Sequence, residues 1–329
     1  MLVPKTALHP PDDSLLPRTQ LDSNVSTIRD GKLEISDRKR HRVITAKDDV
    51  YLVAEAKELG RENRYVADGF LNSTECESLM QLASTIAVEG DGYSEHKSPH
   101  SKYERFEGIT VGRMALMVYF GQAKPEQLQL LLKKTEEARS HVERYFGLDR
   151  PLYFTYTHLV CRTALPDSPM DRSDLSHQIH ADNCLLRDEN VCLRESPAYV
   201  WRDYSAIMYL NDNFQGGEFF FVKDRETKEV EATVSPHCGR MVAFSAGGEN
   251  LHGVRGVLRG RRCALALWFT QDETYLEYER VLASAILERV RSVGSFEGKD
   301  IQVPLRYEDL LVEYAKSDKF LRQLLTSSL

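Results

Sequence analysis

The sequence predicts a mainly β fold with flanking helices, of the α+β class, in which short antiparallel strands form a sandwich or jelly roll. In the second half of the chain, short β-rich segments recur at even spacing, with turn residues such as Gly216 and Gly217 between them. Amphipathic patterns of helical period precede and follow these segments, at residues 125–146 and 275–293. With 329 residues, 42% of them hydrophobic, the chain is long and apolar enough for a sizeable core.

The chain divides into three predicted parts. Residues 1–42 contain Pro, Asp and Ser without a sustained period, which predicts a flexible N-terminal tail. Residues 43–272 form the main domain. Residues 273–329 form a C-terminal helical extension, with helices predicted at 275–293 and 307–325. This extension either buttresses the main domain or makes a dimer contact.

Cap and stop signals define two helices in the main domain. Asn72 or Ser73 caps a helix that runs to about Ile86, and Glu75 is placed to complete a capping box. Pro125 starts a longer helix, which Gly147 ends. The segment 106–120 is either a strand or a strand followed by a short helix. Further strands are predicted near 50–53 and at 152–163, 199–211, 218–222, 230–234, 239–244 and 263–270.

Charge and hydropathy exclude several functional classes. A net charge of −7 and a pI near 5.9 do not support nucleic-acid binding, which usually requires a basic surplus. No segment predicts a membrane span. The opening residues lack the apolar core of a signal peptide, and the last four residues are not an ER-retention signal.

Six cysteines are scattered along the chain without the Cys-x-x-Cys spacing of a zinc site. Cys184 and Cys192 flank a short polar loop, a spacing suited to a disulfide in an oxidising lumen. The alternative is six reduced and mostly buried thiols. The sequence leaves both interpretations open.

A candidate metal site centres on His180 and Asp182. Side chains two apart in a strand point to one face, so this imidazole and carboxylate are able to converge on one ion. His252 follows a glycine-rich turn and begins a new β-rich segment, which makes it the candidate third ligand. Two histidines and one carboxylate leave the opposite coordination positions open, as in non-haem Fe(II) oxygenases.

Arg262 lies ten residues after His252, at the start of an apolar segment that predicts a buried strand. A buried arginine is costly unless a carboxylate meets it, and guanidinium binds carboxylate bidentately. A dicarboxylic keto acid that chelates iron at one end would present its second carboxylate near Arg262. The predicted co-substrate is therefore 2-oxoglutarate.

At these positions the chain resembles the 2-oxoglutarate and Fe(II)-dependent dioxygenases, and more closely the catalytic domain of the prolyl 3-hydroxylases, or leprecans. The resemblance runs from about residue 65 to residue 272. The matching motifs, in chain order, are YTHLVCRT at 156–163, HADNC at 180–184, RDYSAI at 202–207, YLND at 209–212, GGEF at 216–219, CGR at 238–240, GEN at 248–250, HGV at 252–254 and RGRRCALALW at 259–268.

This resemblance implies a double-stranded β-helix whose cofactors are Fe(II), 2-oxoglutarate as co-substrate, and ascorbate. The implied reaction consumes O2, releases succinate and CO2, and hydroxylates C3 of a peptidyl proline in a collagen-like protein or peptide. It also implies the endoplasmic reticulum lumen as the compartment. The helical-repeat and cysteine-rich region that precedes the catalytic domain in leprecans has no counterpart in the sequence.

Other polar residues near these motifs have two interpretations. Tyr156 either hydrogen-bonds the distal carboxylate beside Arg262 or fills the core with its hydroxyl on a backbone group. His158 is interpreted as a core or second-shell histidine rather than a ligand. His177 lies three residues before His180, and an extended His180-x-Asp182 motif leaves it outside the ligand set.

Three alternative functions remain. The first is hydroxylation of a different protein side chain within the same superfamily, because motifs around iron do not define the substrate. The second is a non-catalytic scaffold that retains the fold, which does not explain the intact ligands. The third is a zinc hydrolase built on the same three ligands, which leaves Arg262 without a purpose.

Overall fold

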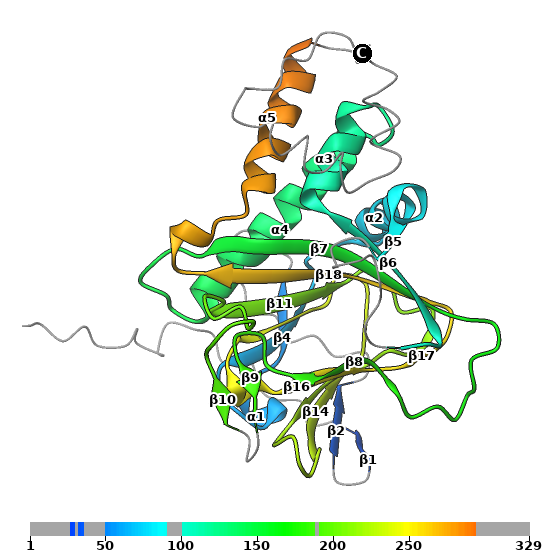
Figure 1. Ribbon diagram of the computed structural model, residues 1–329, viewed down its shortest axis with the longest axis vertical. Helices are drawn as coiled ribbons and strands as arrows, with labels where there is room; N and C mark the ends of the chain where they lie inside the picture. Colours follow the sequence, from blue (N-terminus) through cyan, green and yellow to red (C-terminus); the bar gives the residue numbers. More distant parts are fainter. Residues whose placement is uncertain (1–26, 30–31, 36–49, 91–100, 188–190, 294–329) are drawn as a thin grey trace, which may run out of the picture.

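The computed structural model describes residues 27–29, 32–35, 50–90, 101–187 and 191–293. Their core is two β-sheets stacked face to face, with helices α3, α4 and α5 covering the outer face of the larger sheet (Figure 1). Except for one parallel pair, the strands pair antiparallel. This arrangement confirms the predicted mainly β class and the double-stranded β-helix.

The larger sheet has eight strands in the described part of the chain. In sheet order they are β3 (Tyr51–Ala54), β4 (Arg64–Asp68), β15 (Met241–Ser245), β11 (Tyr204–Tyr209), β18 (Arg261–Thr270), β7 (Tyr153–Ala164), β6 (Glu104–Thr110) and β5 (Val88–Glu89). The smaller sheet has six, in the order β1 (Thr27–Arg29), β2 (Lys32–Ile35), β14 (Val230–Val234), β13 (Phe219–Val222), β16 (His252–Arg255) and β8 (Leu175–His180). Two short pairs complete the set: β9 (Leu185–Leu186) with β10 (Cys192–Leu193), and β12 (Gln215–Gly216) with β17 (Val257–Arg259).

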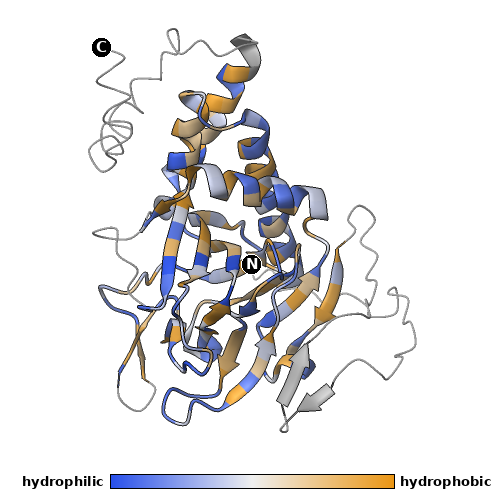
Figure 2. Cartoon of the chain, turned by 90° about the vertical axis from the view of Figure 1, so that its right-hand side faces the viewer, coloured by the Kyte–Doolittle hydropathy of each residue, from blue (hydrophilic) through white to orange (hydrophobic). Residues whose placement is uncertain are grey.

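Alternating side chains give the larger sheet two different faces, because successive residues of a strand point to opposite sides. Hydrophilic and hydrophobic bands accordingly alternate along strands of both layers (Figure 2). On β18 the outward residues join the apolar core beneath the helices; they are Cys263, Leu265, Leu267 and Phe269. The inward residues face the smaller sheet; they are Arg262, Ala264, Ala266 and Trp268.

The described helices are α1 (Ala56–Leu59), α2 (Ser73–Ile86), α3 (Val111–Tyr119), α4 (Pro125–Tyr145) and α5 (Tyr278–Val293), with 3-10 turns η4 (Gly248–Asn250) and η5 (Glu273–Tyr275). The predicted capping box is confirmed, since Asn72 Oδ1 accepts from the Glu75 amide at 2.9 Å and the Glu75 carboxylate accepts from the Asn72 amide at 3.0 Å. None of these helices is long and apolar enough to cross a membrane.

The C-terminal extension buttresses the sheet. Helix α5 packs against α3 and α4 (Figure 1). Just before it, the buried Glu277 carboxylate accepts hydrogen bonds from the Thr157 amide and hydroxyl on β7, at 2.6 and 2.9 Å. The helix predicted at 307–325 lies outside the described residues.

The prediction that residues 1–42 form a flexible tail is wrong for two short segments. Strands β1 and β2 pair with each other, and β2 pairs in parallel with β14 at the edge of the smaller sheet. The partner strand is about two hundred residues away in the sequence, so no local pattern indicates the pairing. The rest of the predicted tail lies outside the described residues.

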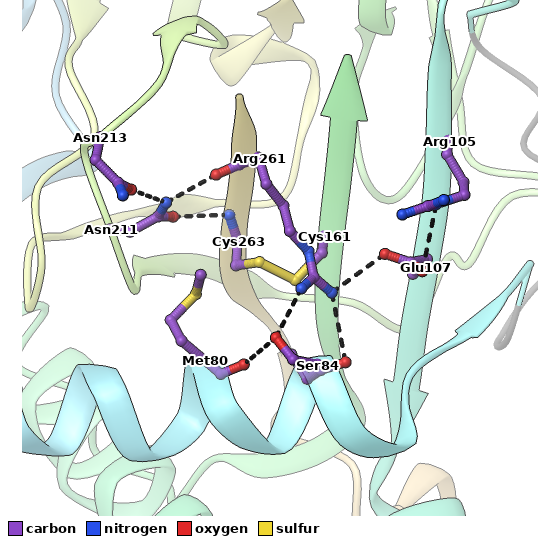
Figure 3. Close-up of a disulfide and its surroundings, with 10 residues drawn as sticks. Met80, Ser84, Arg105, Glu107, Cys161, Asn211, Asn213, Arg261 and Cys263 are labelled. Atoms are coloured by element: carbon purple, nitrogen blue, oxygen red, sulfur yellow. Dashed lines mark hydrogen bonds and ion pairs between the residues drawn. A yellow bond between two sulfur atoms is a disulfide. The ribbon is translucent and has the colours of Figure 1, made fainter. Parts of the chain in front are cut away.

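All six cysteines form disulfides, so the interpretation as reduced thiols is wrong and the Cys184–Cys192 bond is confirmed. The other two bonds are Cys76–Cys238 and Cys161–Cys263. The Cys161–Cys263 disulfide joins β7 to β18. Beside it, the Arg261 guanidinium donates a hydrogen bond to the Ser84 hydroxyl at 2.9 Å (Figure 3). These two cysteines are adjacent because β7 and β18 pair across a sequence separation of 102 residues.

Candidate metal centre and co-substrate pocket

His180, Asp182 and His252 converge between the two sheets, as predicted. His180 ends β8 and His252 begins β16, and the antiparallel register places these two residues opposite each other. Nε2 of His180 lies 3.4 Å from one oxygen of Asp182, and Nε2 of His252 lies 3.8 Å from the other. The three ligand atoms all lie within 4.8 Å of one another, which is close enough to hold one metal ion.

Backbone carbonyls orient both imidazoles toward this point. Nδ1 of His180 lies 2.8 Å from the Gln178 carbonyl, and Nδ1 of His252 lies 2.8 Å from the Asn250 carbonyl. A proton on each Nδ1 satisfies these contacts and leaves the Nε2 lone pair for a metal, the usual arrangement around metal-binding histidines. The side-chain amide of Asn250 in turn donates to the Ser245 carbonyl at 3.1 Å, which holds the η4 turn in place.

Burial and charge keep His252 and Asp182 in the forms that bind metals. Burial lowers the pKa of His252 to about 4, an effect that the nearby His180 reinforces and Asp182 opposes, so this imidazole is neutral at neutral pH. Burial raises the pKa of Asp182, but the hydrogen bond to His180 and the charge that His252 carries at the low pH where Asp182 titrates outweigh this effect, so the pKa of Asp182 lies well below its usual range. Neutral imidazole and ionised carboxylate are the states that bind metals.

The site is open on one side. The side chains of Asp182 and His252 are 5% and 4% exposed, whereas that of His180 is 30% exposed. His177 stacks on His180 with ring centres 4.2 Å apart and lies outside the three-residue cluster, in agreement with its predicted exclusion from the ligand set.

Arg262 is buried on the inner face of β18 and lines the same pocket as the three ligands. Its Nε donates to the Gly217 carbonyl at 2.9 Å. Gly217 has a φ of +72°, and a Cβ there would come within 2.8 Å of Arg262 Cδ, so both conformation and space require glycine. No ion pair involves Arg262 within the described residues, which leaves its guanidinium available to an external carboxylate.

Tyr209, rather than Tyr156, lies beside Arg262. The Arg262 guanidinium carbon is 5.2 Å from the centre of the Tyr209 ring. The Tyr209 hydroxyl is buried and has no hydrogen-bond partner among the described residues. Burial raises the pKa of Tyr209, and the positive charge of Arg262 partly offsets this effect. A buried hydroxyl of this kind fits a carboxylate oxygen bound at Arg262.

The prediction that Tyr156 lies beside Arg262 is wrong. In the β7–β18 register Arg262 faces Arg162, whereas Tyr156 faces Trp268 and stacks on it with ring centres 5.7 Å apart. Six residues of strand, about 20 Å, separate the two positions. His158 lines the pocket but is not among the three ligands, which agrees with its interpretation as a second-shell or core residue.

Small and aromatic residues shape the space between the ligands and Arg262. The inward residues of β18 next to Arg262 are Ala264 and Ala266, whose short side chains leave room between arginine and metal centre. Phe219 stacks on the His252 ring with centres 5.1 Å apart, and Phe244 packs on it at 4.6 Å. These rings exclude water from the buried side of the site.

The residues present fit a ferrous ion and a keto-diacid. Two imidazoles and one carboxylate are the ligand set of non-haem Fe(II) oxygenases, and they occupy one side of the centre only. The Tyr209 hydroxyl and the Arg262 guanidinium lie together on the facing sheet, where both would be able to donate hydrogen bonds to a carboxylate. Among the described residues this cluster is the one group of three metal-binding side chains.

Comparison with known proteins agrees with this geometry. Residues 173–270 match the 2OG-Fe(II) oxygenase superfamily. The chain is 47% identical over 241 residues to prolyl 3-hydroxylase 2 of Rattus norvegicus, and 48% identical over 240 residues to that of Gallus gallus. Each match covers 73% of this chain and 34% of the relative. With prolyl 3-hydroxylase 1 of Homo sapiens the identity is 45% over 246 residues, covering 74% of this chain and 33% of the relative.

The chain spans about a third of the length of the curated relatives that it matches. Residues 173–270, which match the superfamily, contain His180, Asp182, His252 and Arg262. The chain is thus a homologue of the prolyl 3-hydroxylases and carries a 2OG-Fe(II) oxygenase domain.

Proposed function

We infer that this chain hydroxylates C3 of a peptidyl proline in a collagen-like protein, with Fe(II), 2-oxoglutarate and O2 as reactants and succinate and CO2 as by-products. One observation carries the proposal: three ligand atoms within 4.8 Å of one another face a buried arginine that has no ion-pair partner among the described residues. Proline is proposed as the target because the relatives are named prolyl 3-hydroxylases. Fe(II), 2-oxoglutarate and O2 are proposed as reactants because the ligand set is that of non-haem Fe(II) oxygenases.

The chain's own residues divide the work. His180, Asp182 and His252 would hold Fe(II), which when bound supplies the oxidative decarboxylation of the keto acid and the attack on an unactivated C–H bond. Arg262 and the Tyr209 hydroxyl would donate hydrogen bonds to the distal carboxylate of the keto acid. The Gly217 carbonyl fixes the guanidinium through Nε. Phe219 and Phe244 keep water from the buried side of His252.

We also propose that the protein functions in an oxidising compartment. Three disulfides bind all six cysteines, and disulfides form and persist in secretory compartments rather than the cytosol. The endoplasmic reticulum lumen fits both the disulfides and a protein substrate of the collagen type.

The test is direct. The protein is incubated with Fe(II), ascorbate and 2-oxoglutarate, with or without Gly-Pro-hydroxyproline peptides, and succinate is measured alongside the peptide mass. We expect peptide-dependent succinate and one added oxygen on proline, with amino-acid analysis identifying the 3-hydroxy isomer. Peptides with lysine or asparagine in place of the reacting proline test the alternative of another side chain. Oxygen added only to those residues contradicts the proline proposal, and absence of succinate with every peptide favours a scaffold.

A further inference from the structure

A row of aromatic side chains leads from the wall of the pocket to the protein surface. Trp268 lines the pocket together with the metal ligands. The Arg202 guanidinium lies 4.4 Å from the Trp268 ring and 4.0 Å from the Tyr199 ring. Tyr199 packs edge-on against Trp201 at 5.6 Å, and Trp201 stacks on Tyr275 at 4.5 Å with an interplanar angle of 2°. We call these four rings with Arg202 the aromatic row.

Hydrogen bonds to backbone carbonyls connect the aromatic row to the residues beside the metal centre. Asn183, next to the ligand Asp182, donates its side-chain amide to the Arg202 carbonyl at 2.9 Å. The Arg202 amide donates to the Tyr199 carbonyl at 3.0 Å and closes the turn that carries Tyr199 and Trp201. The row therefore has a fixed position relative to the ligands, and binding there costs little reorganisation.

The Tyr275 end of the row is held separately. Tyr275 ends η5, a short turn whose first amides are capped by the Asp272 side chain, which accepts from the Thr274 amide at 3.0 Å. The Tyr275 amide itself donates to the Asp272 carbonyl at 3.1 Å. Two separately fixed turns thus hold Trp201 and Tyr275 in their stacked arrangement, and neither ring belongs to a hydrophobic core cluster.

Two rings of the row are exposed although they are large, and the other two are half-buried. Tyr199 is 51% exposed and Tyr275 is 41% exposed, and neither belongs to a hydrophobic core cluster. In the described part of the chain the exposed large aromatic side chains are confined to this region: Tyr199, Tyr275 and Tyr278. Exposed rings gathered beside an active site are typical of a binding surface.

We propose that the aromatic row is an exosite that binds a proline-rich flank of the protein substrate in the polyproline II conformation, outside the catalytic pocket. The proposal rests on the proposed function. Trp268 belongs both to the pocket lining and to the row, so the flank of a peptide whose reacting residue enters the pocket beside Trp268 would lie against the row. Polyproline II segments have no internal hydrogen bonds and little conformational entropy to lose, so they bind chiefly by packing proline rings between aromatic side chains.

The test compares a long peptide, with proline-rich flanks around the reacting residue, with a short peptide that lacks the flanks. Binding of the labelled long peptide to the full chain is measured by fluorescence anisotropy, and kcat/KM is measured for both peptides. We expect Trp201→Ala and Tyr275→Ala each to weaken long-peptide binding and kcat/KM about tenfold. The short peptide and the KM for 2-oxoglutarate should not change.

Two controls separate ring packing from a loss of structure. Trp201→Phe keeps an aromatic ring and should restore long-peptide binding to within about twofold of wild type. Met170→Ala removes an exposed apolar side chain outside the row and should leave both peptides unaffected. An equal loss for the two peptides, or unchanged long-peptide binding, overturns the proposal. So does a change of sedimentation mass in Trp201→Ala, which would make the row a contact between copies.

The design also distinguishes this inference from the proposed function. Binding is measured without turnover, so Trp201-dependent binding of the long peptide in the absence of proline hydroxylation supports the exosite and contradicts the proposed reaction. Hydroxylation of both peptides with binding that ignores Trp201 supports the reaction and contradicts the exosite.

Discussion

The two faces of the eight-stranded sheet differ in kind, although the same strands supply both. The inner face carries Arg262 and two alanines opposite the metal ligands, whereas the outer face carries leucines and cysteines beneath α3, α4 and α5. The inner face thus has buried charge and space, and the outer face has close packing. Because side chains alternate along each strand, one face of a strand carries the predicted site and the other carries the core. Substitutions on the inner face should therefore change activity, and those on the outer face should change stability.

The metal ligands opposite the inner face should give the largest effect on activity. We expect Asp182→Ala to reduce turnover about a thousandfold or more, because one of three ligands is lost. Bound iron, measured by mass spectrometry of the purified protein, should fall with it. His177→Ala is the matched control, since its ring stacks on His180 without belonging to the cluster. Loss of iron in His177→Ala equal to that in Asp182→Ala would show that the ligand assignment is incorrect.

Arg262 should separate affinity from stability. We expect Arg262→Met to raise the KM for 2-oxoglutarate about 100-fold, because a buried bidentate contact to carboxylate is lost. The melting temperature should stay the same or rise, since the substitution removes a buried charge without an ion-pair partner in the described structure. Arg262→Lys keeps the charge but not the paired hydrogen bonds, so its KM for 2-oxoglutarate should lie between those of wild type and Arg262→Met. An unchanged KM in Arg262→Met would remove this residue from the co-substrate site.

Tyr209 and Tyr156 provide a finer test of the inner face, because each has been considered as a hydrogen-bond donor to the distal carboxylate of 2-oxoglutarate. Tyr209→Phe removes one hydroxyl beside Arg262 and should raise the KM for 2-oxoglutarate up to about tenfold. Tyr156→Phe should leave that KM unchanged, because the residue faces Trp268 at the far end of β18. Steady-state kinetics on both variants measure the difference, and the reverse order of effects would restore Tyr156 to the site.

The predicted site residues that the structure brings together, His180, Asp182, His252 and Arg262, share local evidence in the sequence. A few neighbouring residues are enough to recognise the His180-x-Asp182 spacing. The same is true of His252 and Arg262, which stand at the starts of predicted strands. Tyr209 was missed because its contact with Arg262 depends on the β11–β18 register, in which Tyr209 faces Ala264. Pairing between strands far apart in the sequence is not encoded by either strand alone. The same reason applies to the Cys161–Cys263 disulfide and to β2 beside β14.

Glu277 tests the outer face, where the smallest effect is expected and where activity should not change. Its carboxylate is buried against Thr157, and burial raises its pKa to about 7, an effect that Arg280 opposes. A carboxyl whose pKa is higher in the folded than in the unfolded state contributes stability that is full below pH 4.5 and is lost as the pH rises through about 7.

We therefore expect Glu277→Gln, which is neutral at every pH, to gain stability relative to wild type between pH 5 and pH 8, by about 1–3 kcal/mol. Denaturant unfolding at both pH values measures this difference. Glu273→Gln, an exposed carboxylate on η5, is the control and should show no such trend. Because Glu277 is on the helix-covered face, kcat/KM for the peptide should match wild type at pH 7. A loss of activity without loss of stability in Glu277→Gln would break the separation between the two faces, since it would require the outer face to act on the pocket through the sheet.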